Sequence, residues 1–233
     1  MRDAVPIDIE TIADPRFILL AWAAGLGLVT GAVHLARIVG PGFTWLAGGT
    51  AGLLGLAGLG MGGSWGSRLA LGAVVIAMLL ARYRFAGALL LLASVAYLVD
   101  AAGLGGWLLA TTAALALGGV SGEMALGHWY LVDPRLPRWA LRSLAGLGIF
   151  GLVADGVALA YVGDVARSGP TIAFLSLLAM SVLLMLAVLG SLRYPAYSGV
   201  MAATGLSYLA VLTSLGAIFL GRALVAGVGP FSI

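Results

Sequence analysis

The feature that most constrains this chain is an almost unbroken series of apolar segments, each long enough to cross a lipid bilayer. The hydrocarbon core of a bilayer is about 30 Å thick, so one spanning helix needs roughly 20 mostly apolar residues. Hydrophobic residues make up 62% of the 233 positions and charged residues only 9%, which excludes a soluble domain. The sequence therefore predicts an all-α, polytopic integral membrane helical bundle.

Short breaks that contain proline, glycine or charge divide the apolar sequence into about eight expected transmembrane helices. Residues 1–16 form a polar N-terminal tail, residues 17–220 the membrane domain and residues 221–233 a C-terminal tail. The expected helices cover residues 17–39, 43–61, two short segments within 68–103, then 107–132, 139–162, 171–192 and 197–220. The two segments within 68–103 depend on the interruption at residues 82–84, and a single crossing is the alternative. Residues 103–106 are expected to connect the fourth and fifth helices, which would leave two four-helix halves.

The absence of cysteine and lysine excludes several classes of function. The chain has no cysteine, which excludes disulfides, thiolate catalysis, iron–sulfur clusters and covalently attached haem. All twelve basic residues are arginine, so a Schiff-base lysine is excluded as well. The arginines are scattered over short loops, a pattern that does not indicate nucleic-acid binding. The first segment lacks the basic start of a cleavable signal, and we expect the first helix to be retained.

The distribution of arginine predicts the orientation of the helices. If successive helices cross the bilayer in alternate directions, seven arginines fall on one face and five on the other. Arginine excess marks the cytoplasmic side, so both termini are expected outside, in a bacterial inner (plasma) membrane. The seven are Arg37, Arg82, Arg84, Arg135, Arg138, Arg142 and Arg193.

The two histidines are the first candidates for chemistry. His34 and His128 each lie inside an expected helix, about 8 Å and about 6 Å from the ends that reach the arginine-rich face. Small residues such as Gly31 share a helical face with His34, which would leave room for a flat macrocycle. Arg37 follows His34 by about one turn, and Met124 precedes His128 by about one turn.

This arrangement suggests haem binding. Two neutral imidazoles on two helices can ligate the iron of a b-type haem axially, and an arginine at that face can pair with a haem propionate. We assign His34 and His128 as expected metal ligands, with Arg37 and Met124 beside the haem. The alternative is that each imidazole simply bonds to a carbonyl or hydroxyl of a neighbouring helix.

Two acids are expected inside the bilayer, where an ionised carboxylate is expensive and marks a functional site by default. They are Glu123 and Asp155, and Tyr130 shares a helical face with Glu123. Either acid could carry a proton or donate a hydrogen bond to a quinone. The alternative is a neutral carboxylic acid bonded to a neighbouring helix.

Three functions follow from these residues. The first is a quinone-linked electron-transfer subunit that binds one haem b and belongs to a larger membrane complex, because a soluble catalytic domain is missing. The second is a small-solute or proton-coupled transporter whose path includes the two acids. The third is a cofactor-free structural subunit that packs through glycine-rich faces.

Overall fold

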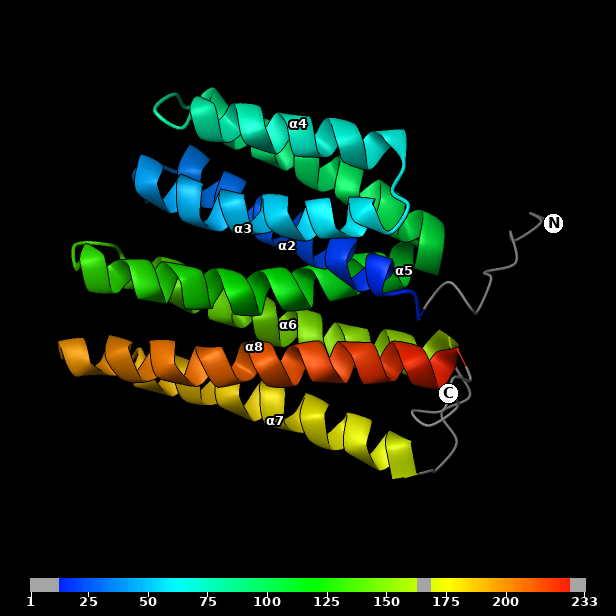
Figure 1. The fold of residues 1–233 in the computed structure, drawn as a ribbon. Coiled ribbons are helices and arrows are strands. Elements are labelled where there is room, and N and C mark those ends of the chain that lie inside the picture. The colour runs from blue at the N-terminus through cyan, green and yellow to red at the C-terminus, as the bar shows by residue number, and fades with distance from the viewer. Residues whose placement is uncertain (1–12, 163–168, 227–233) are drawn as a thin grey trace.

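The computed structural model describes residues 13–162 and 169–226, and this part of the chain is a bundle of helices without strands (Figure 1). Among the described residues, six helices are long and apolar enough to cross a membrane, and α4 is shorter. The predicted class, a helical integral membrane bundle, is confirmed. The helices are α2 (Pro15–Leu35), α3 (Pro41–Gly60), α4 (Trp65–Leu79), α5 (Phe85–Val132), α6 (Arg138–Val162), α7 (Gly169–Ser191) and α8 (Tyr197–Val225).

The expected count of eight helices is wrong, because the described part of the chain forms seven. The segments expected as the fourth and fifth helices belong to one element, α5, which is 48 residues long. Within α5 only Gly106 leaves helical geometry, with φ 79° and ψ 156°. Glycine adopts positive φ without a steric penalty, so one residue makes the change of direction that we assigned to a four-residue connection.

Contacts with α2 show which way the first half of α5 runs. A side chain added at Gly31 would lie 2.8 Å from the carbonyl oxygen of Gly87, and one at Gly27 would lie 2.6 Å from the Ser94 hydroxyl. The numbering rises along α5 as it falls along α2. The segment before Gly106 is therefore antiparallel to α2.

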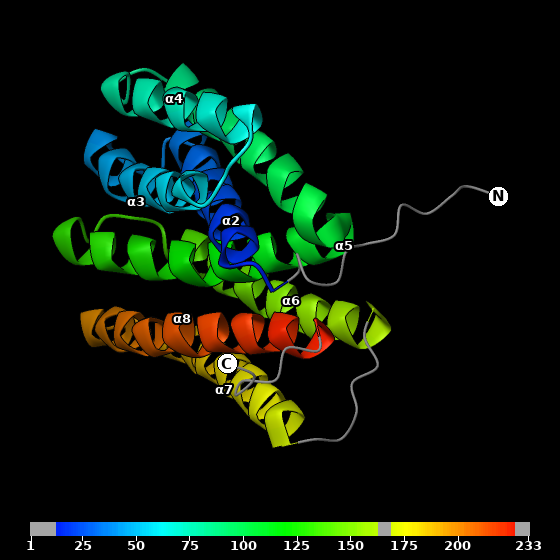
Figure 2. The same ribbon diagram turned by 45° about the vertical axis from the view of Figure 1, so that its right-hand side comes forward.

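The second half of α5 runs the other way. Gly25 packs against Gly118, and Val29, about one turn further along α2, packs against Gly122. The numbering now rises in both helices, so the chain reverses at Gly106 and α2 lies between the two halves of α5 (Figures 1 and 2). A straight helix of this length would extend about 72 Å, more than twice the thickness of a bilayer core.

The helices differ in how far the bundle covers them. In the most apolar stretch of α2, 72% of the residues are buried, whereas in that of α7 only 22% are buried. Close packing of α2 depends on glycine, since Gly25 and Gly118 bring their backbones into contact. The centre of the bundle is thus α2 with α5, and α7 lies at its edge.

Two helix ends differ from the expected positions. α2 ends at Leu35 rather than at residue 39, because Arg37 takes a left-handed conformation with φ 55°. Pro41 does not end that helix but begins α3, at the first-turn position where proline needs no hydrogen-bond donor. α8 continues to Val225, so Arg222, which we assigned to the C-terminal tail, lies within a helix.

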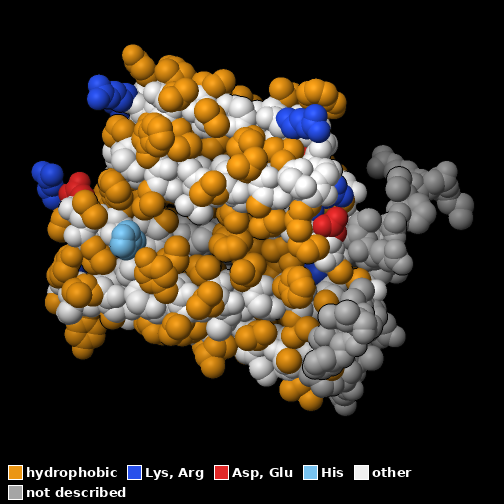
Figure 3. All heavy atoms as spheres, viewed as in Figure 1, with side chains coloured by type: hydrophobic (Ala, Val, Ile, Leu, Met, Phe, Trp, Pro, Cys, Tyr) orange, Lys and Arg blue, Asp and Glu red, His pale blue; other side chains and the backbone are white. Residues whose placement is uncertain are grey.

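On the face drawn in Figure 3, charged side chains lie at the two ends of the bundle and a broad apolar band separates them. At one end Arg138 donates to the carbonyl of Pro195 at 2.7 Å, and Arg142 donates to that of Leu192 at 2.9 Å. These bonds tie the start of α6 to the turn between α7 and α8. We call this the arginine end. Arg2, Arg167 and most of both expected tails lie outside the described residues.

Candidate functional site

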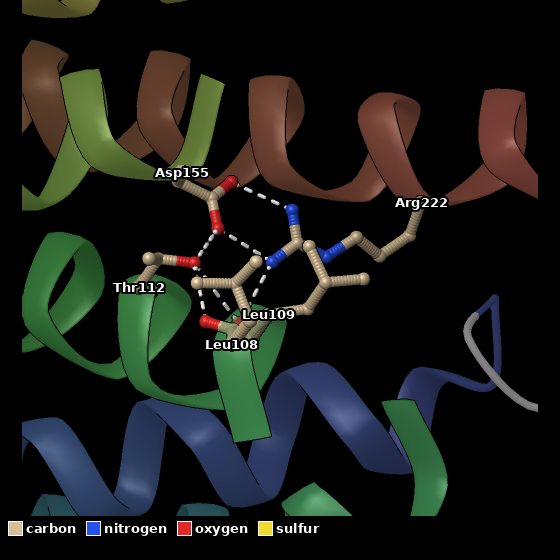
Figure 4. Close-up of polar contacts among 5 residues, drawn as sticks. All are labelled: Leu108, Leu109, Thr112, Asp155 and Arg222. Carbon is tan, nitrogen blue, oxygen red and sulfur yellow. Dashed lines mark hydrogen bonds and ion pairs between the residues drawn. The ribbon is translucent and has the colours of Figure 1, made fainter. Parts of the chain in front are cut away.

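A buried ion pair joins α6 to α8. The guanidinium of Arg222 donates from both terminal nitrogens to the two carboxylate oxygens of Asp155, each at 2.6 Å (Figure 4). Thr112 donates to the same carboxylate at 2.7 Å, and Arg222 also donates to the carbonyl of Leu109 at 3.0 Å. The guanidinium carbon lies 5.4 Å from the ring centre of Phe17. Two parallel charge-assisted bonds fix this pair in one geometry.

The pair is almost completely removed from solvent, with side-chain exposures of 0% for Arg222 and 2% for Asp155. Charges at such a site are retained only when each is paired and hydrogen-bonded. The sequence identified Asp155 but missed its partner. The signal that was overlooked is that the apolar sequence around Arg222 continues to residue 225, so the arginine is not at the end of its helix.

Glu123 lies in the second half of α5 and is fully buried. Neither of its carboxyl oxygens makes a hydrogen bond within the described residues. Ser207 of α8 lies beside this carboxyl, but the geometry between them falls short of a hydrogen bond. Glu123 is therefore a carboxyl group without a satisfied partner in the interior of a membrane protein, where such a group is expensive.

The hydroxyl groups near Glu123 already use their hydrogens. Ser207 donates to the carbonyl of Thr204 at 2.9 Å, and Thr204 donates to the carbonyl of Val200, also at 2.9 Å. Their oxygens can still accept, so a protonated carboxyl could donate to them, whereas a carboxylate would need one of these hydroxyls to give up its present hydrogen bond. This local chemistry favours the protonated form of Glu123.

Glu123 belongs to a line of buried polar residues. On α5, Thr112 and Tyr130 lie eleven and seven residues from Glu123, spacings that return nearly to the same helical face. On α8, buried polar residues recur at spacings of three, seven and eight, which also mark one face. We call this set the polar seam; it consists of Thr112, Glu123 and Tyr130 of α5, Asp155 of α6, and Thr204, Ser207, Ser214 and Arg222 of α8.

The seam reaches the arginine end at Tyr130. Arg138 donates to the Tyr130 hydroxyl at 3.5 Å, and the rings of Tyr130 and Tyr197 lie 6.5 Å apart. Tyr197 donates in turn to the carbonyl of Leu131 at 3.3 Å. The face that the sequence assigned to Glu123 and Tyr130 is thus directed at α8, a pairing of helices that the sequence did not reveal.

His34 has partners for both of its ring nitrogens. Nδ1 lies 2.7 Å from the Thr44 hydroxyl of α3, and Nε2 lies 3.1 Å from the carbonyl of Tyr83 in the turn before α5. The side chain is only 8% exposed. These bonds correspond to the alternative considered from the sequence, an imidazole that joins neighbouring helices.

His128 lies at an exposed position on α5, and its Nδ1 is 3.4 Å from the Tyr208 hydroxyl of α8. Met124 is half-buried. The two imidazoles therefore have polar partners on different elements, and no group of three His, Asp or Glu residues suited to a metal ion occurs in the described part of the chain. The haem hypothesis stays a prediction. To ligate an iron, His34 would have to give up its hydrogen bond with either the Thr44 hydroxyl or the Tyr83 carbonyl.

The fold and the polar seam define the class of this protein as a helical integral membrane protein with ionisable groups between its helices. Comparisons with family models, with curated proteins and with solved structures find no match for the chain. Its function must therefore be argued from the seam itself.

Proposed function

We propose that this chain is a membrane transport protein that carries protons, with Glu123 as the proton-carrying acid. The observation that carries the proposal is a fully buried carboxyl without a hydrogen bond, located between two spanning helices. A buried polar group without a partner costs about 1–3 kcal/mol, and membrane proteins retain intramembrane acids mainly where they act on ions or protons. Transport makes use of such a group because it can gain and lose its proton.

The neighbouring hydroxyls allow both states of the acid. When Glu123 is protonated, Ser207 keeps its hydrogen on the Thr204 carbonyl and its oxygen can accept from the acid. When Glu123 loses the proton, rotation of the Ser207 hydroxyl turns the same group into a donor to the carboxylate. A small rotation at Ser207 therefore accompanies each transfer of a proton.

The seam supplies polar groups on both sides of Glu123. Tyr130 lies about 10 Å along α5 toward the arginine end, and Thr112 lies about 16 Å toward the other end. Protons cross such gaps only through ordered water, which requires polar groups along the way. Asp155 and Arg222 hold each other in a bidentate pair, so we assign them to the structure of the seam and not to proton carriage.

Proton flux into liposomes tests the proposal. Liposomes that contain the protein and a trapped pH-sensitive dye are given a potassium diffusion potential, and the wild type is expected to acidify the interior. Glu123→Gln keeps the shape of the side chain but cannot carry a proton, so its flux should fall to that of empty liposomes. Retention of wild-type flux by this variant would reject the assignment.

Asp100→Asn is the matched control. Asp100 is an acid outside the seam whose two carboxylate oxygens lie 2.5 Å and 2.6 Å from the Ser64 hydroxyl, which donates to this carboxylate. Its replacement should leave the flux intact. The midpoint of thermal unfolding of Glu123→Gln should equal that of the wild type, because a neutral amide replaces a neutral acid. An infrared spectrum should also lose one protonated-carboxyl band in Glu123→Gln only.

The haem hypothesis is a separate proposal. The quinone and the partner subunits expected from the sequence depend on it. In its favour, His128 is exposed, and within the described residues only its Nδ1 makes a hydrogen bond. A reduced-minus-oxidised visible spectrum of the purified protein decides it. A b-type band that disappears in both His34→Ala and His128→Ala would support it, and the absence of a band would reject it.

A further inference from the structure

A cavity of about 230 Å³ opens at the arginine end, between the end of α2 and the turn from α4 to α5. Its lining includes His34 and three arginines, Arg37, Arg82 and Arg84. Within the described residues none of these arginines forms an ion pair with an acidic side chain. The cavity therefore combines three uncompensated positive charges, a combination that attracts an anion.

The backbone of Arg37 adopts a conformation in which glycine is more stable than arginine, which favours a functional role for the Arg37 side chain. Arg37 occupies the position after the end of α2 with φ 55°, and its N–H donates to the His34 carbonyl at 3.0 Å. The N–H of Ile38 donates to the carbonyl of Val33 at 3.1 Å, which completes a Schellman motif. Glycine is the usual residue at this position, because a side chain makes the left-handed conformation unfavourable.

His34 fixes the walls of the cavity. Through Thr44 and the Tyr83 carbonyl its ring connects α2, α3 and the turn that carries Arg82 and Arg84. The cavity is thus held by hydrogen bonds among three elements, and the arginines need not gather when a ligand arrives. A preformed site loses less free energy on binding.

We propose that this cavity binds the phosphate group of an anionic phospholipid. Arginine presents several N–H donors in a planar fork that matches phosphate oxygens. Basic pockets between transmembrane helices are known to bind anionic head groups. This site is independent of proton carriage by Glu123.

The surroundings favour a lipid over a soluble phosphate. The cavity lies at the end of helices long enough to span a bilayer, where the head groups would be, and large apolar side chains beside it are exposed. Leu79 is 70% exposed, Tyr83 58% and Phe85 51%, and the rings of Tyr83 and Phe85 stack at 5.5 Å. A lipid that places its phosphate among the arginines can lay its acyl chains along this surface.

Lipid binding can be measured by native mass spectrometry of the protein titrated with phosphatidylglycerol or with phosphatidylcholine. We expect the wild type to retain phosphatidylglycerol in preference. The triple variant Arg37→Gln, Arg82→Gln, Arg84→Gln should bind it about a hundredfold more weakly, since each arginine near an anionic lipid contributes roughly a fivefold effect. The control is Arg135→Gln with Arg193→Gln, two arginines of the same end outside the cavity, which should change little.

Three outcomes would overturn the proposal: equal retention of the two lipids, equal losses in the triple variant and its control, or displacement of the lipid by inorganic phosphate at matched concentration. The last would assign the site to a soluble phosphate.

Arg37→Gly is a second variant that does not depend on the folding of the triple variant. Glycine should raise the midpoint of thermal unfolding in lipid-free detergent, because it relieves the left-handed conformation, while phosphatidylglycerol binding falls about fivefold. A gain in stability without loss of lipid would contradict a role for Arg37 in binding.

Discussion

At the scale of single residues, the Asp155–Arg222 pair illustrates how a buried charge depends on its partner. Asp155→Asn leaves the Arg222 guanidinium in an apolar interior without a countercharge. Removal of one member of a buried pair costs about 3–5 kcal/mol. We therefore expect the free energy of unfolding of Asp155→Asn, measured in mixed micelles of increasing denaturing detergent, to fall by about that amount.

The double variant Asp155→Leu with Arg222→Leu is the control for this prediction. Replacing both charges by apolar groups removes the desolvation cost as well as the attraction, and the result is often near neutral. The double variant should therefore be more stable than Asp155→Asn. A double variant that is no more stable than Asp155→Asn would contradict this account of the pair.

An exposed carboxylate gives a prediction about pH. A side-chain hydrogen bond from Arg135, followed by one from its backbone N–H, lowers the pKa of Asp133 at the end of α5. A pKa that is lower in the folded state stabilises the protein above the unfolded-state value, and this contribution disappears as the pH falls through the folded-state value. Asp133→Asn should therefore be slightly less stable than the wild type at neutral pH.

Thermal unfolding of both proteins over a series of acidic pH values checks the sign. The small difference should shrink as Asp133 becomes protonated, and it should be weaker in high salt, because exposed pairs are screened. A difference that grows with acidity would contradict the assignment.

At the scale of helices, glycine contacts determine how closely α2 and α5 approach. A methyl group added at Gly25 would lie 2.0 Å from the carbonyl oxygen of Ala114, a backbone atom that cannot move independently. Gly25→Ala should therefore lower the free energy of unfolding by roughly 3 kcal/mol, at the upper end of overpacking effects. Denaturing-detergent titration measures the loss.

Gly146 of α6 is the matched control, because nothing lies within 4 Å of an added side chain there. Gly146→Ala should be neutral or stabilise the protein by about 0.5–1 kcal/mol, the gain expected from alanine in a helix interior. Equal losses at the two positions would mean that the close approach of α2 and α5 does not limit stability.

The existence of the helices could be predicted because apolar runs and breaks are local properties of the sequence. Their ends were harder to predict. A proline marked the boundary between α2 and α3, but the left-handed turn at Arg37 could not be expected, since arginine rarely adopts it. The tight reversal at Gly106, a single residue in place of the expected four-residue connection, also depends on one backbone conformation that composition does not encode.

Of the candidate site, the sequence could predict the two buried acids but not the arrangement of polar residues around them. Glu123 and Asp155 could be found because an acid in an apolar segment stands out by itself. The polar seam could not, since serine and threonine are common in membrane helices and only the pairing of α5 with α8 places Ser207 beside Glu123. The expected meeting of His34 and His128 rested on their similar depth, which does not determine which neighbours a helix faces.

At the scale of the whole molecule, the reversal of α5 determines which loops share a side of the membrane. Residues 80–84 and 133–137 flank α5 and should lie together at the arginine end, while residues near Gly106 lie at the other end. Arginine excess marks the cytoplasmic side, so the arginine end should face the cytoplasm.

The absence of cysteine makes this topology directly measurable, because any single introduced cysteine is the only thiol. In intact bacterial cells an impermeant maleimide should label Gly103→Cys, an exposed position near the reversal, but not Tyr83→Cys or Arg135→Cys. The last two should react only after permeabilisation, since both are expected on the cytoplasmic side. Labelling of Tyr83→Cys and Arg135→Cys from opposite sides would mean that α5 crosses the bilayer once, which would remove the antiparallel packing of its two halves around α2. Labelling of both from outside, with Gly103→Cys protected, would keep the fold and invert its orientation.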